Sequence, residues 1–472
     1  GFRKNLYLKR SDTSRKDEST GRLKVNWQLA DNTKIKFLIS QVDLNDPADI
    51  WTIDGSLNTL SDRPGMDSQK TNSYGMKVFH SFDGFELQSY TSSTDTNVIF
   101  SYDADWGNTD SHFPYVYDYF SETLRDRKSF NQEFRAVSDS ADFQKNSFFE
   151  WVIGANYLEL KESNLKKDDG LYGDPSDPYG PYASASASSS KYKSSNFSVF
   201  GNLDYLLSAS LKFSIGLRWE DWEADYSDSL QESFNPTDKM SGGKISLIKN
   251  MTNDTNMYAS LAKGYKQGGF NLGLGLDANA TNKNLAYDPE FLTNYELGIN
   301  TKLLDSRVTF NGVLFYSDRE DQQVLISTQT DPSDPNTFSF LTQNAAEGVN
   351  HGLEINMDMG INQSLSAFVN LGILKTEIKN WQSRQDLEGR AQAHAPERSY
   401  ALGLNWAPTS HTYLAIDFTG KSSFYYSDSH NNKSKSYVLT NLNLGYVKNN
   451  WNYELWARNI FDEYYSVRGF YF

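Results

Sequence analysis

The stretch SASLKFSIGLRWE, residues 208–220, contains in one segment the pattern that decides the fold. A short polar turn comes first, and apolar and polar side chains then alternate one by one. An extended chain therefore has one apolar face, Leu211, Phe213, Ile215, Leu217 and Trp219, and one polar face, Lys212, Ser214, Gly216, Arg218 and Glu220. This period of two predicts a β-strand that leaves a tight turn and separates two environments.

The same alternation returns along the chain, as in HGLEINMDM (351–359) and SYALGLNWA (399–407), and no segment shows a convincing helical period. Short and long connections alternate between the expected strands. Short turns fall at 30–33, 81–84, 139–147, 208–210, 249–255, 304–307, 360–363, 407–410 and 447–450. Long polar loops are expected at 41–73, 91–129, 159–196, 221–241, 264–293, 318–350, 377–398 and 419–436.

This asymmetry between the connections predicts the architecture. A transmembrane β-barrel has short turns at its periplasmic end and long loops at its extracellular end. Structureless loops of more than about 15 residues are uncommon in compact soluble domains. A two-layer sandwich with one solvated face would show the same alternation, but it does not need long loops on one side only. We therefore expect an all-β, transmembrane antiparallel β-barrel whose apolar faces point into lipid.

Composition agrees with this class and argues against several others. The 472 residues include 29 Tyr, 29 Phe and 10 Trp, which favour strands, and no Cys. The lack of cysteine excludes disulfides and thiolate chemistry, and the net charge of −15 argues against nucleic-acid binding. No run of 18 apolar residues predicts a transmembrane helix. The six histidines have no metal-ligand spacing, so we expect no metal site.

The short turns define nine hairpins and therefore eighteen strands. FRKNLYLKR (2–10) has the pattern of one more strand, which makes about nineteen. Bacterial single-chain barrels close with an even number of strands. We therefore expect that terminal strands are absent from this chain.

Five segments resemble the barrel of TonB-dependent outer-membrane receptors: YASLAKGYKQGGFN (258–271), PEFLTNYELGINTKLLDSRVTFNGVLFYSD (289–318), NAAEGVNHGLEINMDM (344–359), APERSYALGLNW (395–406) and WNYELWARNIFDEYYSVRGFYF (451–472). The first half of the chain resembles the same barrel in its alternation of short turns and long loops. The resemblance implies the outer membrane of a Gram-negative bacterium, a barrel of twenty-two strands, and uptake of a scarce, bulky nutrient. Ferric siderophore is the preferred substrate class because it is common in the family.

The resemblance also implies partners. Family members carry an N-terminal plug domain preceded by a box that binds TonB, and we expect residues 1–472 to be barrel alone. The TonB–ExbB–ExbD complex would act through such a plug, and outer-membrane lipid or lipopolysaccharide would surround the barrel. We expect no cofactor, because iron would be carried only as a bound chelate. We expect no enzymatic activity, because loop carboxylates such as Asp318 and Glu320 have no matched base, nucleophile or metal partner.

The segment SLAKGYKQGGFN (260–271) lies at the expected extracellular rim, because the turn at 249–255 is short and therefore periplasmic. Its glycines, Gly264, Gly268 and Gly269, would let the strand bend sharply away from the barrel wall. The side chains expected to face the vestibule are Tyr265, Lys266, Gln267, Phe270 and Asn271.

Aromatic rings and cations in the other long loops would complete a site for an anionic or catecholate chelate. The candidates are Trp51, Trp106, Tyr115, Tyr117, Arg319, Arg384, Arg398, Tyr425, Tyr426 and Arg468. The Ser/Gly/Pro-rich segment 166–190 is expected to be a mobile loop. Its aspartates lack the spacing of a calcium loop.

Two alternatives stay open on the sequence alone. A passive porin-like channel would suit a barrel without a plug, and a soluble glycan-binding β-protein would also suit aromatic loops. The sequence does not distinguish a ferric siderophore from cobalamin, an oligosaccharide or another chelate as the ligand.

Overall fold

The computed structural model describes residues 3–139, 148–271, 286–329, 338–381, 384–428 and 430–468. Within these ranges the chain is all-β, apart from the short 3-10 helix η2 (Gln385–Leu387). None of the described segments forms a helix that is both long and apolar enough to span a membrane. The chain divides into two compact units, which are described separately.

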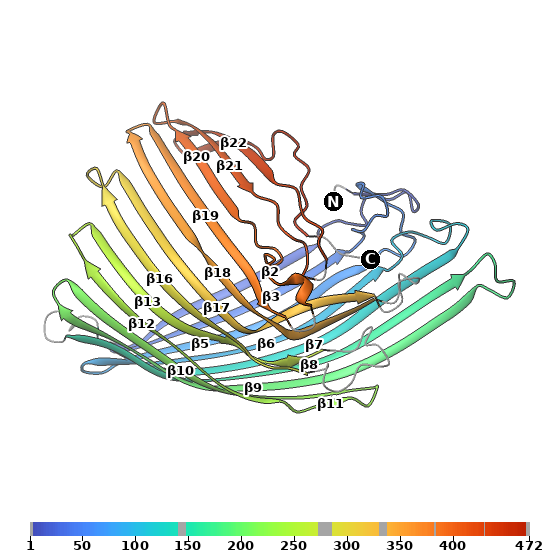
Figure 1. Cartoon of the computed structure of the whole chain (residues 1–472), viewed down its shortest axis with the longest axis horizontal. Helices are drawn as coiled ribbons and strands as arrows, with labels where there is room; N and C mark the ends of the chain where they lie inside the picture. Colours follow the sequence, from blue (N-terminus) through green and yellow to red (C-terminus); the bar gives the residue numbers. More distant parts are fainter. Residues whose placement is uncertain are drawn as a thin grey trace. The chain divides into compact units, whose positions relative to one another are not determined.

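The first unit comprises Gly1–Lys145, Glu150–Gly201 and Trp219–Lys239. Its long strands are β2 (Glu18–Ala30), β3 (Thr33–Pro47), β5 (Met66–Ser81), β6 (Phe85–Asp103), β7 (Val116–Ser138), β8 (Phe149–Gly173) and parts of β9 (Tyr182–Ser208) and β10 (Leu211–Asp228). From β2 to β8, successive long strands pair antiparallel, and Figure 1 shows β5 to β8 as long neighbouring ribbons. The short strands β1 (Lys4–Asn5), β4 (Asn58–Thr59) and β11 (Ser233–Phe234) lie in the connections.

The second unit comprises Asn146–Phe149, Asn202–Arg218 and Met240–Phe472. Besides the remaining parts of β9 and β10, its long strands are β12 (Thr237–Asn250), β13 (Thr255–Lys266), β16 (Glu290–Leu303), β17 (Val308–Gln329), β18 (Phe338–Asn362), β19 (Leu365–Asn380), β20 (Arg398–Trp406), β21 (Thr412–Lys421), β22 (Tyr437–Lys448) and β23 (Trp451–Ala457). Each pairs antiparallel with the next long strand. The short strands β14 (Gly269–Phe270) and β15 (Ala286–Tyr287) pair with each other.

The nine hairpins expected from the sequence are confirmed in the described residues: short turns join β2 to β3, β5 to β6, β9 to β10, β12 to β13, β16 to β17, β18 to β19, β20 to β21 and β22 to β23, and the pair β7–β8 completes the set. The turn expected at 139–147 lies mostly outside the described residues. The expected all-β, antiparallel fold is therefore confirmed.

The strand expected over residues 2–10 is wrong. Only Lys4–Asn5 is extended there, as β1, and it pairs in parallel with β4 rather than with a long strand. Asn5 is almost fully buried, and its amide donates to Asp49 Oδ2 at 2.9 Å and to the Ser61 carbonyl at 2.8 Å. Asn5 also exchanges two backbone hydrogen bonds with Arg10, and these close a turn in which the neighbouring Leu6 stays exposed.

The bounds of several expected loops are also wrong, because the strands continue far into them. Strand β8 runs to Gly173 and β9 begins at Tyr182, so most of the loop expected over 166–190 is strand. The ladder between β7 and β8 continues without a register shift from Val137↔Val152 to Val116↔Gly173. Beyond the lipid both faces of a strand contact water, so apolar alternation stops although backbone pairing continues. Alternation therefore marks the lipid-facing part of each strand, not its end.

The faces of the strands are reversed relative to a soluble protein. On β10 the apolar Leu217 is 65% exposed, whereas Glu220, three residues further along on the opposite face, is 8% exposed. On β17 the apolar Leu314 and Tyr316 are exposed as well, whereas Ser317 on the other face is buried. A soluble domain would bury this set. Apolar side chains outside and charges inside are the arrangement of a transmembrane β-barrel.

The inward faces carry networks of polar side chains. In the second unit, Asn294 donates to Glu296 Oε1 at 2.8 Å, and Ser317 donates to Asn294 Oδ1 at 2.7 Å. Ser317 and Ser260 are both buried. Buried polar groups are tolerated when they are hydrogen-bonded to one another, so these strands can expose their apolar side chains to lipid and keep a stable polar interior.

Replacing Leu217 by Arg is expected to destabilise the protein in lipid vesicles by about 2 kcal/mol, because a lipid-facing arginine is costly in a transmembrane barrel. Leu230→Arg is the matched control, since Leu230 is equally exposed, at 65%, but lies in the connection after β10. Urea unfolding followed by heat-modifiable gel migration measures both variants. Equal, near-zero effects would contradict the lipid-facing assignment of Leu217.

Candidate functional site

In the second unit, Arg319 on β17 is the centre of a polar cluster at the long-loop end of the strands. Its Nε donates to Glu290 Oε1 at 2.8 Å, and its Nη1 donates to Gln392 Oε1 at 3.2 Å. The second oxygen of Glu290 accepts the backbone N–H of Gln323 at 2.9 Å. Glu290 is buried and Arg319 is mostly buried. Arg319 therefore joins β16, β17 and the connection 381–397 and is not a free cation.

A β-bulge places the next side chains of this cluster. The register between β17 and β18 shifts between Arg319 and Gln323, and Asp321 has a positive φ of 52°. A bulge turns the side chains that follow it, and Gln322 becomes 5% exposed. A Cβ on Gly348 would lie 2.5 Å from Gln322 Oε1 and 2.6 Å from Gln392 Nε2, so a larger residue there would push these two amides aside.

The rim segment 267–271 is held to β17 and β18. Gln323 Nε2 donates to the Gln267 carbonyl at 2.9 Å. The amide of Asn271 bonds both backbone groups of Thr342, donating to the carbonyl at 2.8 Å and accepting from the N–H at 2.6 Å. Asn271 thus pairs with β18 as a strand residue would. The position of the segment is set by these bonds rather than by a ligand.

A second clamp joins the connections 381–397 and 422–436. The guanidinium of Arg390 donates to the carbonyls of Ser427 and His430 at 3.0 and 2.8 Å, and it pairs with Asp428 at 3.2 Å. Its Cζ lies 4.3 Å from the centroid of the Tyr425 ring. The Arg390 side chain is only 8% exposed. A single buried cation therefore holds two connections that are far apart in sequence.

Under this clamp lies a small apolar core of Val324, Ile326, Ile378, Trp381 and Leu387. It combines the long-loop ends of β17 and β19 with helix η2. Burying a large apolar side chain contributes about 1.5–3 kcal/mol. This core therefore stabilises the connection 381–397 as a folded structure.

In the first unit the corresponding strand ends carry an aromatic group around Trp51. Its ring centroid lies 5.3 Å from that of Tyr102 and 6.4 Å from that of Phe100. Trp51 and Trp106 line one small pocket together with Asp49, Ser61 and Asp103. Trp106 has a positive φ of 63°, a conformation rare for a large side chain. Aromatic faces beside acidic groups form a second candidate binding surface.

The carboxyl group of Asp103, which lines this pocket, has a raised pKa. Asp103 is the last residue of β6 and lies beyond the lipid-facing part of that strand, since Asp95 already forms an exposed ion pair with Lys128. Burial raises the pKa of Asp103 to about 7, and the charges of Asp105 and Asp62 act in the same direction. Its Oδ2 has no hydrogen-bond partner among the described residues. Asp103 can therefore change charge near neutral pH.

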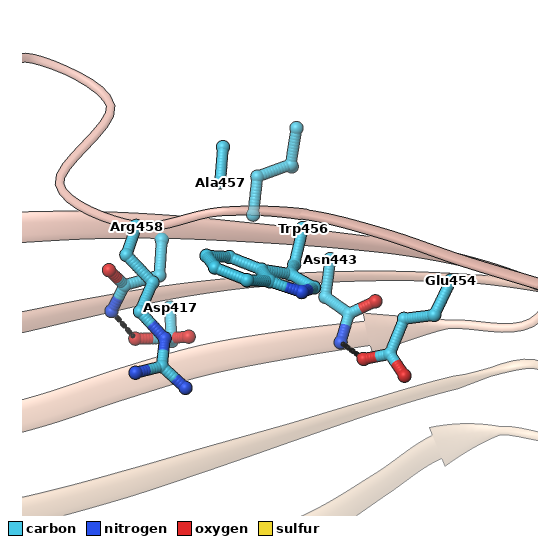
Figure 2. A pocket seen from close by; sticks show the side chains of 8 residues that line it. Asp417, Asn443, Glu454, Trp456, Ala457 and Arg458 are labelled. Carbon is cyan, nitrogen blue, oxygen red and sulfur yellow. Dashed lines mark hydrogen bonds between the residues drawn. The ribbon is translucent and has the colours of Figure 1, made fainter. Parts of the chain in front are cut away.

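A second pocket lies on the polar face of β21 to β23. In Figure 2, Trp456 lies between Asp417 and Arg458 on one side and Asn443 and Glu454 on the other. Asn441 Nδ2 donates to Asp417 Oδ2 at 2.7 Å, and Asn443 Nδ2 donates to Glu454 Oε1 at 2.5 Å. The guanidinium of Arg458 lies 5.4 Å from the Trp456 ring.

The structure brings together some of the predicted site residues. Gln267, Asn271 and Arg319 belong to one cluster through Gln323 and Thr342, and Trp51 and Trp106 share one pocket. Tyr265 accepts a hydrogen bond from Arg218 Nε at 3.2 Å, and Lys266 is the exposed last residue of β13. Phe270 lies in the short strand β14. The bend expected at Gly264 is wrong, because Gly264 pairs regularly with Leu292 inside β13.

Other predicted residues lie elsewhere. Arg384 pairs with Asp386 beside helix η2, and Tyr425 lies between the cations of Arg390 and Lys433. Arg398 lies on the same face of β20 as the exposed Leu402 and Leu404, which is the outward face. Tyr115 is exposed in the connection before β7, and Arg468 follows β23 in an irregular segment. Whether any of these residues binds a ligand stays a prediction.

The sequence does not indicate Glu290, Arg390 or Gln392 as site residues, because they lie in segments without alternation. Their partners are distant, as for Arg390 and Asp428, so no local pattern indicates the contacts. Among the described residues no group of three or more His, Cys, Asp or Glu could hold a metal ion.

Comparison with known proteins gives a consistent result. Residues 6–460 match the family model "TonB dependent receptor-like, beta-barrel". Similar solved structures include the ferric yersiniabactin uptake receptor FyuA from Yersinia pestis, with 17% identity and a TM-score of 0.77 over 100% of this chain and 70% of that one. The siderophore receptor PiuA from Acinetobacter baumannii has 15% identity and a TM-score of 0.72 over 96% and 71%. The copper transporter OprC has 14% identity and a TM-score of 0.71 over 98% and 69%. At these identities the likeness shows a shared fold.

Raising the pH from about 4 to 7 is expected to loosen the Trp51 pocket. The folded pKa of Asp103, about 7, lies above its ordinary value of 3.8, so the folded state holds the proton more tightly. The free energy of unfolding is then highest at a pH below the pKa that Asp103 has in the unfolded chain. It falls as the pH rises through the pKa of Asp103 in the folded protein, by at most roughly 4 kcal/mol. Hydrogen exchange of peptides from 48–65, corrected for intrinsic rates, measures this. Asp103→Asn should remove the pH dependence of exchange in these peptides. Asp31→Asn is the control and should leave it unchanged, because Asp31 lies in an exposed turn.

Replacing Arg390 by Gln is expected to release the segment 422–428 from the connection 381–397. Removing one partner of a buried ion pair costs about 3–5 kcal/mol, so exchange protection in this segment should fall strongly. Arg384→Gln is the control, because its ion pair with Asp386 is local and more exposed. Unchanged protection in Arg390→Gln would show that the backbone contacts of Ala393 and His394 with Tyr425 hold the two connections without Arg390.

Proposed function

Because the chain belongs to the TonB-dependent receptor-like β-barrel family, we propose that it is an outer-membrane receptor for TonB-dependent uptake of a ferric siderophore. The observation that carries this proposal is the reversal of the strand faces, with exposed Leu217 beside buried Glu220. Such strands are stable only where lipid covers the apolar face. Members of the family are transporters and receptors rather than enzymes.

The long-loop ends support ligand capture rather than free passage. Arg319, Arg390 and their partners fold the connections of the second unit into ordered structure, and in the first unit the ring of Trp51 packs against Tyr102 and Phe100. Pre-ordered polar and aromatic groups reduce the entropy cost of binding a bulky ligand. A passive channel does not need such surfaces.

The substrate class is proposed from chemistry and from relatives. The ring of Trp51 suits the rings of a ferric chelate, and the exposed Lys266 suits its negative charge. Similar structures include proteins described as a ferric yersiniabactin uptake receptor and a siderophore receptor. Iron would be cargo held by the chelate, and the protein would need no resident cofactor. Energy would come from the TonB–ExbB–ExbD complex through a plug domain.

Binding of ferric siderophores to the purified full-length protein tests this proposal. A panel of one catecholate, one hydroxamate and one phenolate ferric chelate, with cobalamin as the non-iron ligand, is titrated against intrinsic tryptophan fluorescence. Lys266→Ala, at the outer end of β13, should weaken binding of the preferred chelate by about tenfold through loss of one charge-assisted contact. Lys249→Ala is the matched control, because Lys249 lies at the turn end of the same hairpin.

Two further measurements separate the alternatives. Protein abundance in outer membranes should rise when an iron chelator is added to the medium. Single-channel conductance of the full-length protein should be nearly closed. Binding of cobalamin alone would replace the siderophore assignment and keep the receptor, whereas a large open conductance without binding of any ligand would favour a porin.

A further inference from the structure

A polar core holds the connection 48–65 of the first unit to the start of the chain. Asn5, Asp49, Thr59 and Ser61 are almost fully buried in it. Asn5 Nδ2 donates to Asp49 Oδ2 at 2.9 Å, and Thr59 Oγ1 donates to the same oxygen at 2.7 Å. Both bonds of this carboxylate use one oxygen. Its Oδ1 therefore has no hydrogen-bond partner within the described part of the chain.

The Trp51 pocket is a cavity in this core. Its volume is about 10 Å³, which is the space that one water molecule or one ion needs. Three polar residues line it, Asp49, Ser61 and Asp103. Ser61 Oγ and Asp103 Oδ2 have no hydrogen-bond partner among the described residues, and these residues are only 2% and 6% exposed. Buried polar groups are nearly always bonded, so one bound particle in this cavity would satisfy both atoms.

Further carboxylates surround the cavity. The charges of Asp62 and Asp105 act on Asp103. Both oxygens of Asp105 accept backbone N–H groups, from Gly107 at 2.8 Å and from Tyr119 at 2.7 Å, so this carboxylate is fixed in place. Like charges that are held together away from water repel strongly. A cation in the cavity would offset this repulsion, whereas a water molecule would not.

The basic side chains of these connections are engaged by other acids. Arg63 pairs with Asp118 at 2.8 Å and also with Asp169. Lys16 pairs with Asp46 at 2.6 Å. Within the described ranges, none of the ion pairs includes a carboxylate that lines the cavity. A positive charge at the cavity would therefore come from a bound ion.

We propose that this cavity is a calcium site held by Asp49, Ser61 and Asp103. Calcium binds carboxylate and carbonyl oxygens, and two carboxylates match the charge of a divalent ion. Magnesium keeps several of its waters, and the cavity has room for one particle only.

The ligand set is made of oxygen atoms alone, so the scattered histidines of the sequence do not bear on it. No three acidic or imidazole side chains of the described chain converge on one point. The Ser61 hydroxyl and backbone carbonyls of the lining residues would therefore supply the oxygens beyond the two carboxylates. Such a site would join the connection that carries Trp51 to the end of β6. The inference concerns the first unit and does not depend on the transported substrate.

Terbium luminescence of the full-length protein in detergent, after treatment with EDTA, tests this inference. Terbium binds at calcium sites and emits when a nearby tryptophan is excited, and Trp51 and Trp106 line the cavity. Calcium should displace terbium, with a calcium Kd of about 10⁻⁴–10⁻³ M. Asp103→Asn should weaken calcium binding by about tenfold or more, because affinity depends on the charge of the ligands. Asp174→Asn, in the connection between β8 and β9, is the matched control and should bind calcium like the wild type.

Hydrogen exchange of peptides from 48–65 gives a second measurement that does not depend on terbium. At pH 7, calcium at ten times its Kd should slow exchange in these peptides about tenfold relative to EDTA. Asp103→Asn should show no such effect. Heat-modifiable migration confirms the fold of each variant. If Asp103→Asn does not fold, Ser61→Ala is measured instead and should weaken calcium binding severalfold through loss of a neutral ligand.

Four outcomes would each overturn the proposal. They are terbium emission that calcium does not displace, equal calcium affinity of the wild type and Asp103→Asn, an equal loss in Asp174→Asn, and displacement by magnesium as effective as by calcium. No ferric chelate is present in these measurements. Failure of this proposal and failure of the transport proposal are therefore separate results.

Discussion

Backbone hydrogen bonding without water is the constraint on which this structure depends. A strand that faces lipid cannot bond its N–H and C=O groups to solvent, so each group needs a neighbouring strand. The long antiparallel ladders of β2 to β8 and of β12 to β23 meet this need. Once the backbone is paired, the side chains on each face of a strand can match the polarity of the medium that they contact. Apolar residues such as Leu23 and Leu217 then face outward, and Glu220 and Ser317 lie inside.

The same constraint explains why the functional surfaces lie where the ladders end. Past the lipid, water satisfies the backbone, and the chain can form bulges, turns and short helices. The bulge after Arg319, the clamp of Arg390 and the apolar core around Trp381 occur there. These connections are held by buried polar and apolar contacts like those of a soluble domain. A receptor needs such order at its rim, because a flexible rim would lose binding free energy when it closed on a ligand.

Charge is distributed differently on the inner, rim and outer surfaces. Inside, acids and amides bond one another, as in the network around Glu296. At the rim of the first unit, burial and neighbouring carboxylates raise the pKa of Asp103 to about 7. On the outer surface of the first unit, lysines are paired with acids, as Lys128 is with Asp95 and Lys161 is with Glu159.

The sequence by itself determined the strand alternation, the nine hairpins and the reversal of the faces, because these depend on neighbours within a few residues. Five segments taken together along the chain also indicated the family. The sequence also indicated the rim segment 260–271 and the aromatic residues Trp51 and Trp106. It did not determine where strands end, and it assigned residues 2–10 to a strand that β1 and its turn replace. Nor did it indicate Glu290, Arg390 or Gln392. The tertiary structure decided these features, because the pairing of polar strands beyond the lipid and the contacts between Arg390 and Asp428 join residues that are distant in sequence and leave no periodic signal.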